Sequence, residues 1–88
     1  MRDEAMKEES LRRIAERGVL PGQRYRHYKT NDVYLVVAVG LNEPDLEPLV
    51  HYRVATDEYG LVWTRNLDIF CGRALQGETF VQRFVRVE

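Results

Sequence analysis

The feature that most constrains the fold is a change of sequence period near Pro21. Before it, residues 3–17 contain no Pro or Gly and carry opposite charges four residues apart, which is typical of a helix that ends at Gly18. After it, β-branched and aromatic residues recur at every second position or in short runs, which is typical of strands. The sequence therefore predicts an N-terminal amphipathic helix over residues 1–18 and a small β-barrel domain over residues 19–88.

Turn-forming residues divide the second part into five or six short strands. The longest apolar run, Val33–Val39, predicts a central strand buried on both faces, with Val37 in a dry core. Asn66–Phe70 predicts one helical turn, and a last hairpin follows over Cys71–Leu75 and Glu78–Val87. The predicted fold class is mainly β: a small SH3-like barrel or strongly bent antiparallel sheet with one N-terminal helix. The alternative is an open α+β sheet with the helix across one face.

Composition restricts the class of protein further. With 88 residues, 44% hydrophobic and 31% charged, the chain suits one globular domain. No apolar run reaches the roughly 20 residues of a membrane span, and the first residues lack the apolar region of a secretory signal, so we expect a cytoplasmic protein without membrane contact. The single cysteine, Cys71, excludes an internal disulfide and a cysteine-rich metal site, and two histidines alone make a poor one. We expect no metal and no cofactor.

Several sequence blocks together resemble one protein family. Residues 25–29 read YRHYK, residues 46–53 read LEPLVHYR, and residues 59–70 contain YG followed by WTRNLDIF. With Gly77 and the closing Arg83-Phe84, these blocks resemble, in the same order, those of a bacterial family catalogued as domain of unknown function 1653. The resemblance covers about residues 22–84 and implies one domain there, but no activity. Asn66 stands where that family usually has Pro.

The candidate binding residues combine cations with aromatic rings. Eleven of the thirteen basic residues are Arg, which suits stacked or bidentate contacts with anions. The net charge of −1 gives no overall attraction to nucleic acid, so any such role depends on a local cluster. Aromatic rings stack on bases or cations, and guanidinium groups bind phosphate or carboxylate. The predicted ligand-binding residues are Arg26, His27, Tyr28, Lys29, Arg53, Trp63 and Arg65.

Three functional hypotheses follow from this set. The first is a non-enzymatic module that recognises an anionic ligand or nucleic acid, with Arg26, Arg53 and Arg65 converging at strand ends. The second is a protein- or peptide-interaction module with an aromatic groove. The third and least favoured is a small enzyme that pairs a histidine with a carboxylate, because no local catalytic motif is present. No catalytic residue is predicted, and the partner is unknown.

A structural interpretation competes with all three hypotheses. The aromatic side chains would form the core, which is favoured for Trp63, Phe70 and Phe84, while Arg stems cover it. Acidic residues between the guanidinium groups would then make the cluster an ion-pair network; the candidate acids are Glu47, Glu58 and Asp68.

Overall fold

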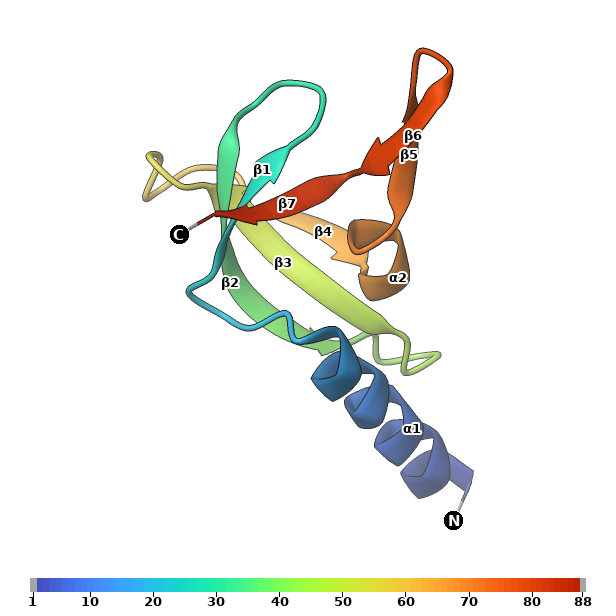
Figure 1. Cartoon of the computed structure of the whole chain (residues 1–88). Helices are drawn as coiled ribbons and strands as arrows, with labels where there is room; N and C mark the ends of the chain where they lie inside the picture. Colours follow the sequence, from blue (N-terminus) through green and yellow to red (C-terminus); the bar gives the residue numbers. More distant parts are fainter. Residues whose placement is uncertain (1, 88) are drawn as a thin grey trace.

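The computed structural model describes residues 2–87 and has a mainly β architecture (Figure 1). A five-stranded antiparallel sheet curls strongly into a half-barrel, a two-stranded hairpin projects from it, and one N-terminal helix extends away from the lower ends of β2 and β3 in this view. The predicted bent antiparallel sheet is confirmed, and the open α+β sheet is not adopted. The elements are α1 (Arg2–Arg17), β1 (Arg24–His27), β2 (Val33–Leu41), β3 (Pro48–Val54), β4 (Trp63–Asn66), α2 (Leu67–Phe70), β5 (Arg73–Gln76), β6 (Thr79–Gln82) and β7 (Phe84–Val87).

The strand order of the large sheet is β4-β3-β2-β1-β7, so β2 is its central strand. The first and last strands pair along their whole lengths, from Arg24 opposite Val87 to His27 opposite Phe84. Between β2 and β3 the register shifts at Val37, which leaves this residue without a direct partner. Such a bulge bends the strand and increases its twist. It therefore contributes to the curl of the half-barrel.

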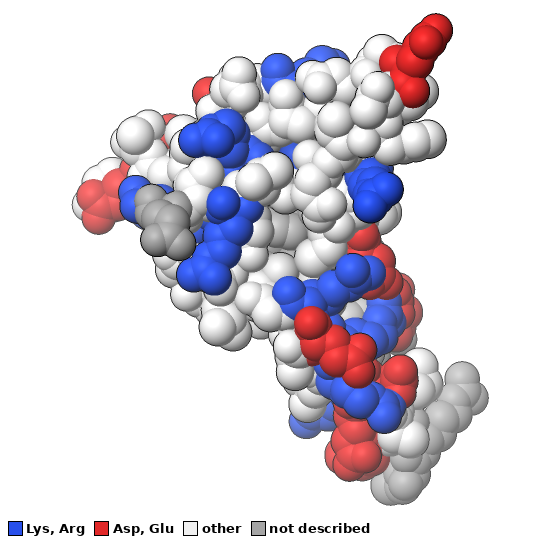
Figure 2. All heavy atoms as spheres, viewed as in Figure 1, with Lys and Arg blue, Asp and Glu red and all other residues white. Residues whose placement is uncertain are grey.

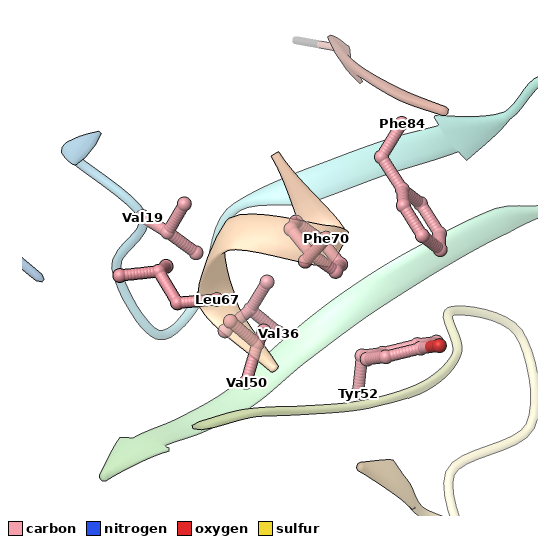
Figure 3. Packing of buried hydrophobic residues seen from close by; sticks show 7 residues of the cluster. All are labelled: Val19, Val36, Val50, Tyr52, Leu67, Phe70 and Phe84. Atoms are coloured by element: carbon pink, nitrogen blue, oxygen red, sulfur yellow. The ribbon is translucent and has the colours of Figure 1, made fainter. Parts of the chain in front are cut away.

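The hydrophobic core lies on the concave side of the half-barrel (Figure 3). The rings of Phe70 and Phe84 are stacked, with centroids 4.2 Å apart and planes at 12°. This contact joins α2 to β7, two elements on opposite sides of the core. The buried core residues are Val19, Val36, Val50, Tyr52, Leu67, Phe70 and Phe84.

The prediction that β2 is buried on both faces is wrong. Val36 is 1% exposed, whereas its neighbour Val37 is 38% exposed. The sheet is a single curled layer, and in the described residues only its concave side carries the core cluster. The convex side of β2 therefore meets solvent, although an apolar run of this length is typical of a strand covered on both faces.

Polar contacts connect α1 to the β-sheet domain. The hydroxyl of Ser10, which is 4% exposed, donates to the carbonyl oxygen of Leu46 at 2.6 Å. Ile14 packs against the core cluster, but Leu11, one turn earlier on the same side of the helix, is 49% exposed. The helix ends as predicted at Gly18, which has φ +70° and whose N–H donates to the Ile14 carbonyl at 3.1 Å. The apolar face of α1 is thus used only near its C-terminus.

The short helix α2 agrees with the prediction from the sequence, whereas the last strands differ from it. The predicted helical turn is present, and the Asn66 side-chain oxygen caps it by accepting the N–H of Asp68 at 2.8 Å. The predicted last strand, Glu78–Val87, is instead two strands, β6 and β7. Arg83 separates them: its N–H donates to Gly72 and its carbonyl accepts the Tyr28 N–H, both at 3.0 Å. The chain thereby passes from the hairpin to the large sheet.

Candidate functional site

A pocket of about 180 Å³ opens on the concave side of the half-barrel. We call it the concave pocket. All five strands of the large sheet contribute to it: the lining residues are His27, Tyr34, Tyr52, Trp63, Arg65 and Phe84.

Strand register explains why these side chains meet. Tyr52 on β3 is directly opposite Trp63 on β4, so both side chains point to the same side of the sheet. Arg65 is two residues further along β4 and therefore shares that side. On the other half of the sheet His27 is paired with Phe84. The curl of the sheet brings the two halves to face each other.

Aromatic rings form the floor of the concave pocket. The Tyr34 and Tyr52 rings pack edge to face with centroids 5.3 Å apart, and Tyr52 and Phe84 also lie 5.3 Å apart. The imidazole of His27 packs against Phe84 at 5.0 Å. Rings in such edge-to-face contacts hold one another in place. The floor is consequently built of packed rings, to which the hydroxyls of Tyr34 and Tyr52 and the imidazole of His27 add polar atoms.

One ring nitrogen of His27 is occupied by a hydrogen bond within the protein. The backbone N–H of Lys29 donates to Nδ1 of His27 at 3.2 Å. In a neutral imidazole the proton then resides on Nε2. Burial lowers the pKa of His27 below its ordinary value of 6.5, and the positive charges of Arg65 and Arg83 lower it further. His27 is therefore neutral at pH 7, with an Nε2–H that can donate.

Positive charges dominate the electrostatic field that acts on His27 at the concave pocket. Arg65, Arg83 and Lys29 all act on His27 as positive charges, and Asp32 opposes them. Nε of Arg83 is buried and has no hydrogen-bond partner among the described residues. In the view of Figure 2, basic side chains lie among uncharged ones over the middle of the half-barrel, with acidic side chains at its left edge and at the tip of the hairpin, whereas basic and acidic side chains mix along α1. No carboxylate lines the pocket, so this field is available to an anion.

Trp63 lies at the pocket rather than in the core. The structural interpretation favoured burial of Trp63, Phe70 and Phe84; the two phenylalanines are 1% and 4% exposed, but the indole is 49% exposed. Burial raises the pKa of Tyr52, and the nearby positive charge of Arg65 opposes that effect. The half-exposed indole therefore sits beside a cation and a buried phenol, as a flat wall that a ligand can contact.

Two of the predicted binding residues lie on the other side of the sheet. Arg53 follows the inward-facing Tyr52, so its side chain points to the convex side. There its guanidinium donates to the carbonyl oxygens of Val54, Ala55 and Asp57, at 3.0 to 3.2 Å.

Arg26 precedes the inward-facing His27 on β1 and is exposed. The three guanidinium groups of Arg26, Arg53 and Arg65 therefore do not converge.

Tyr28 and Lys29 lie next to the concave pocket without lining it. The Tyr28 ring is 4.9 Å from the His27 ring, centroid to centroid, and supports it. Lys29 is exposed in the loop between β1 and β2. Of the seven predicted residues, the structure brings His27, Trp63 and Arg65 together and places Tyr28 and Lys29 beside them.

Two of the three acidic residues proposed as partners, Glu47 and Asp68, are engaged by the helix, whereas Glu58 is exposed in the loop before β4. Arg13 of α1 forms ion pairs with Glu47, at 3.1 Å, and with Asp68, and Arg17 adds a second contact to Asp68 at 3.2 Å. The guanidinium of Arg13, and then that of Arg17, holds the pKa of Asp68 below its ordinary value. An ion-pair network is thus present, but between α1 and the domain, with Arg13 in a role that sequence reasoning missed.

Catalytic and metal-binding alternatives find little support in the geometry. His51 contacts the hydroxyl of Thr64 at 2.9 Å, and among the described residues neither histidine forms a hydrogen bond or an ion pair with a carboxylate. Burial raises the pKa of the Cys71 thiol, which keeps it protonated and unreactive. Within residues 2–87, no three His, Cys, Asp or Glu side chains gather in a way that could hold a metal ion. No helix among the same residues is long and apolar enough to cross a membrane.

Sequence reasoning did not select Tyr34 as a site residue. It lies in the apolar run Val33–Val39, where it was interpreted only as part of a strand. The available signal was that Tyr34 is the one residue of that run with a side-chain hydroxyl, and a buried phenol needs a polar neighbour.

Comparison with known proteins gives one match. The family described as "Protein of unknown function (DUF1653)" matches residues 23–86. Neither the curated proteins nor the solved structures contain a significant match to this chain. The matched segment includes all six residues of the concave pocket and excludes α1.

Proposed function

The chain belongs to the DUF1653 family of proteins of unknown function, and we propose that it is a non-enzymatic binding module that holds an anionic group in the concave pocket. One observation carries this proposal. Every polar side chain that lines the pocket can donate a hydrogen bond, and none is a carboxylate. Arg65 donates to the phenol oxygen of Tyr52. The two phenol oxygens are the only acceptors among the side chains that line the pocket and face it, so the donors outnumber the acceptors and an added acceptor can be bound. An anion supplies that acceptor and also neutralises Arg65.

The size of the pocket and the placement of the cations favour one anionic group over a polyanion. A volume of about 180 Å³ holds one carboxylate or phosphate with a short body. A nucleic-acid groove needs a row of cations that follows the backbone. Here Arg26 and Arg53 lie on the other side of the sheet, away from Arg65. The proposal also places the protein in the cytoplasm, where the unpaired Cys71 would stay reduced.

Trp63 offers a direct test because it is the only tryptophan of the chain. Its fluorescence is recorded while acetate, benzoate or inorganic phosphate replaces chloride at constant ionic strength. The expected result is a saturable change in the wild type for at least one of these anions. In Arg65→Gln the midpoint concentration should rise about tenfold, which is the loss of one charge-assisted hydrogen bond.

Arg26→Gln is the matched control, since it removes the same charge from the other side of the sheet. It should titrate like the wild type. The proposal is wrong if no anion gives a saturable change in the wild type, or if Arg65→Gln and the wild type titrate alike.

A further inference from the structure

The strand that carries Trp63 and Arg65 has an unpaired edge. β4 is the terminal strand of the large sheet and pairs only with β3 among the described residues. Its outward N–H and C=O groups are therefore open to an added strand. The opposite edge of the sheet is β7, which pairs with β1 and does not adjoin this segment.

The edge of β4 has only part of the protection that normally prevents pairing. Edge strands are usually protected by short length, by inward-pointing charges, or by Lys and Pro on the edge itself. β4 is short, with four residues, and Arg65 points inward. Residues 61–66 contain no Lys, Pro, Asp or Glu, and their one charged side chain, Arg65, turns to the concave pocket. Three consecutive apolar side chains are instead exposed here: Leu61 at 68%, Val62 at 47% and Trp63 at 49%. An edge without Lys, Pro or an outward-facing charge, beside exposed apolar surface, indicates an interaction site.

The edge and the pocket form one continuous surface. Trp63 and Arg65 belong to β4 and also line the concave pocket. A strand added to β4 would lie about 4.8 Å from it, with alternate side chains on the same side as Trp63 and Arg65. Its end would then lie beside the concave pocket, where Arg65 and His27 can donate hydrogen bonds. A chain end that satisfies these donors carries a negative charge.

From this juxtaposition we infer that the partner is an extended peptide with a free C-terminal carboxylate. The last residues of the peptide pair with the outer edge of β4, and the carboxylate enters the concave pocket. The inference rests on the proposed function, because it names the anionic group. Single-stranded nucleic acid fits less well, since Asp57 and Glu58 in the loop that leads to β4 are exposed and would repel a polyanion.

An array of hexapeptides provides the first test. The peptides of the array differ from one another in their last four positions. Each peptide is synthesised in two forms, one with a free C-terminal carboxylate and one with a C-terminal carboxamide. Binding of the wild-type protein should be confined to a subset of the acids, and amidation should weaken it about tenfold or more, the value of one lost charge contact. Equal binding of acids and carboxamides would overturn the inference, as would binding by none.

Backbone N-methylation of a bound peptide tests strand pairing itself. In a β-ladder only every second residue directs its N–H toward the neighbouring strand. Methylation at successive positions should therefore weaken binding at alternate positions only. A loss at every position, or at none, would exclude pairing along β4.

Controls separate this inference from the proposed function. Arg65→Gln should lose the preference for acids over carboxamides, while Arg26→Gln keeps it. If acetate or phosphate still perturbs Trp63 but no peptide binds, the peptide inference fails and the anion pocket stands; if neither acts, both fail. An oligothymidylate that binds in place of peptides, or a dimer in analytical ultracentrifugation that Thr64→Lys on β4 dissociates, would also overturn the peptide assignment.

Discussion

Substitution of two adjacent valines in β2 tests whether the half-barrel is a single layer. Val36→Ala and Val37→Ala remove the same two methyl groups from the same strand, so the change in intrinsic strand propensity is matched. Val36 is 1% exposed and lies in the core, whereas Val37 is 38% exposed at a bulge. The difference between the two variants therefore measures the burial on each side of the sheet.

The magnitudes follow from the exposed fractions. At Val36 the two methyl groups contribute about 1.6 kcal/mol of transfer free energy, and the cavity brings the loss to about 2–3 kcal/mol. At Val37 no enclosed cavity forms, and the loss should be about 0.5–1 kcal/mol. For a domain of this size these losses correspond to melting-temperature decreases of about 10–20 °C and about 5 °C.

Urea unfolding followed by far-ultraviolet circular dichroism measures both losses without relying on the pocket fluorophore. The slope of the free energy of unfolding against urea should be the same for both variants and the wild type. If the two variants differ by less than about 0.5 kcal/mol, the assignment of a solvent-facing convex side is incorrect. A more severe pair gives the same contrast: Val36→Asp should not fold, and Val37→Asp should remain folded.

Three further predictions concern the helix, a convex-side arginine and the pocket histidine. A fragment of residues 18–88 should fold, with a free energy of unfolding about 1–3 kcal/mol lower, because it loses the packing of α1; an unfolded circular dichroism spectrum would show that α1 is part of the domain. Arg53→Ala should lower the melting temperature, since three carbonyl oxygens lose their donor, yet leave the anion midpoint of Trp63 fluorescence unchanged; a changed midpoint would place Arg53 at the site. Burial lowers the folded-state pKa of His27, so the unfolded chain binds more protons below pH 6.5 and stability should fall as pH drops from 6.5 toward that pKa. His27→Gln should reduce this dependence in pH-resolved melting curves, and an unaltered dependence would assign it to other groups.

Local patterns allow much of the fold to be predicted from the sequence. The change of period near Pro21, the glycine at position 18 and the turn at Asn66–Phe70 each depend on neighbouring residues only, and each has a counterpart in the structure. The exposure of Val37 and the division at Arg83 depend on tertiary structure instead. The alternation of residues along a strand predicts which side chains share a side of the sheet. It does not predict which of the two sides other parts of the protein will cover.

The candidate site is subject to the same limit. Sequence reasoning could gather cations and rings into one list, because residue type alone indicates what they can bind. It could not separate Arg65 from Arg26 and Arg53, since the two sides of three different strands are related only through the register and the curl of the sheet. Tyr34 is hard to predict for a related reason: inside an apolar run, its ring has the same pattern as a core side chain.

The pairing of β1 with β7 has a consequence for synthesis of the chain. The ribosome makes β1 about sixty residues before its outer partner, so the strand edge along Arg24–His27 stays open until almost the whole domain has emerged. Phe84, which completes the stack on Phe70, arrives at the same late moment. A nascent chain that stalls before Phe84 would therefore expose an unpaired strand edge and an uncovered aromatic core at the same time. Such a chain would bind chaperones that recognise exposed apolar surface, and it would not contain a folded binding site.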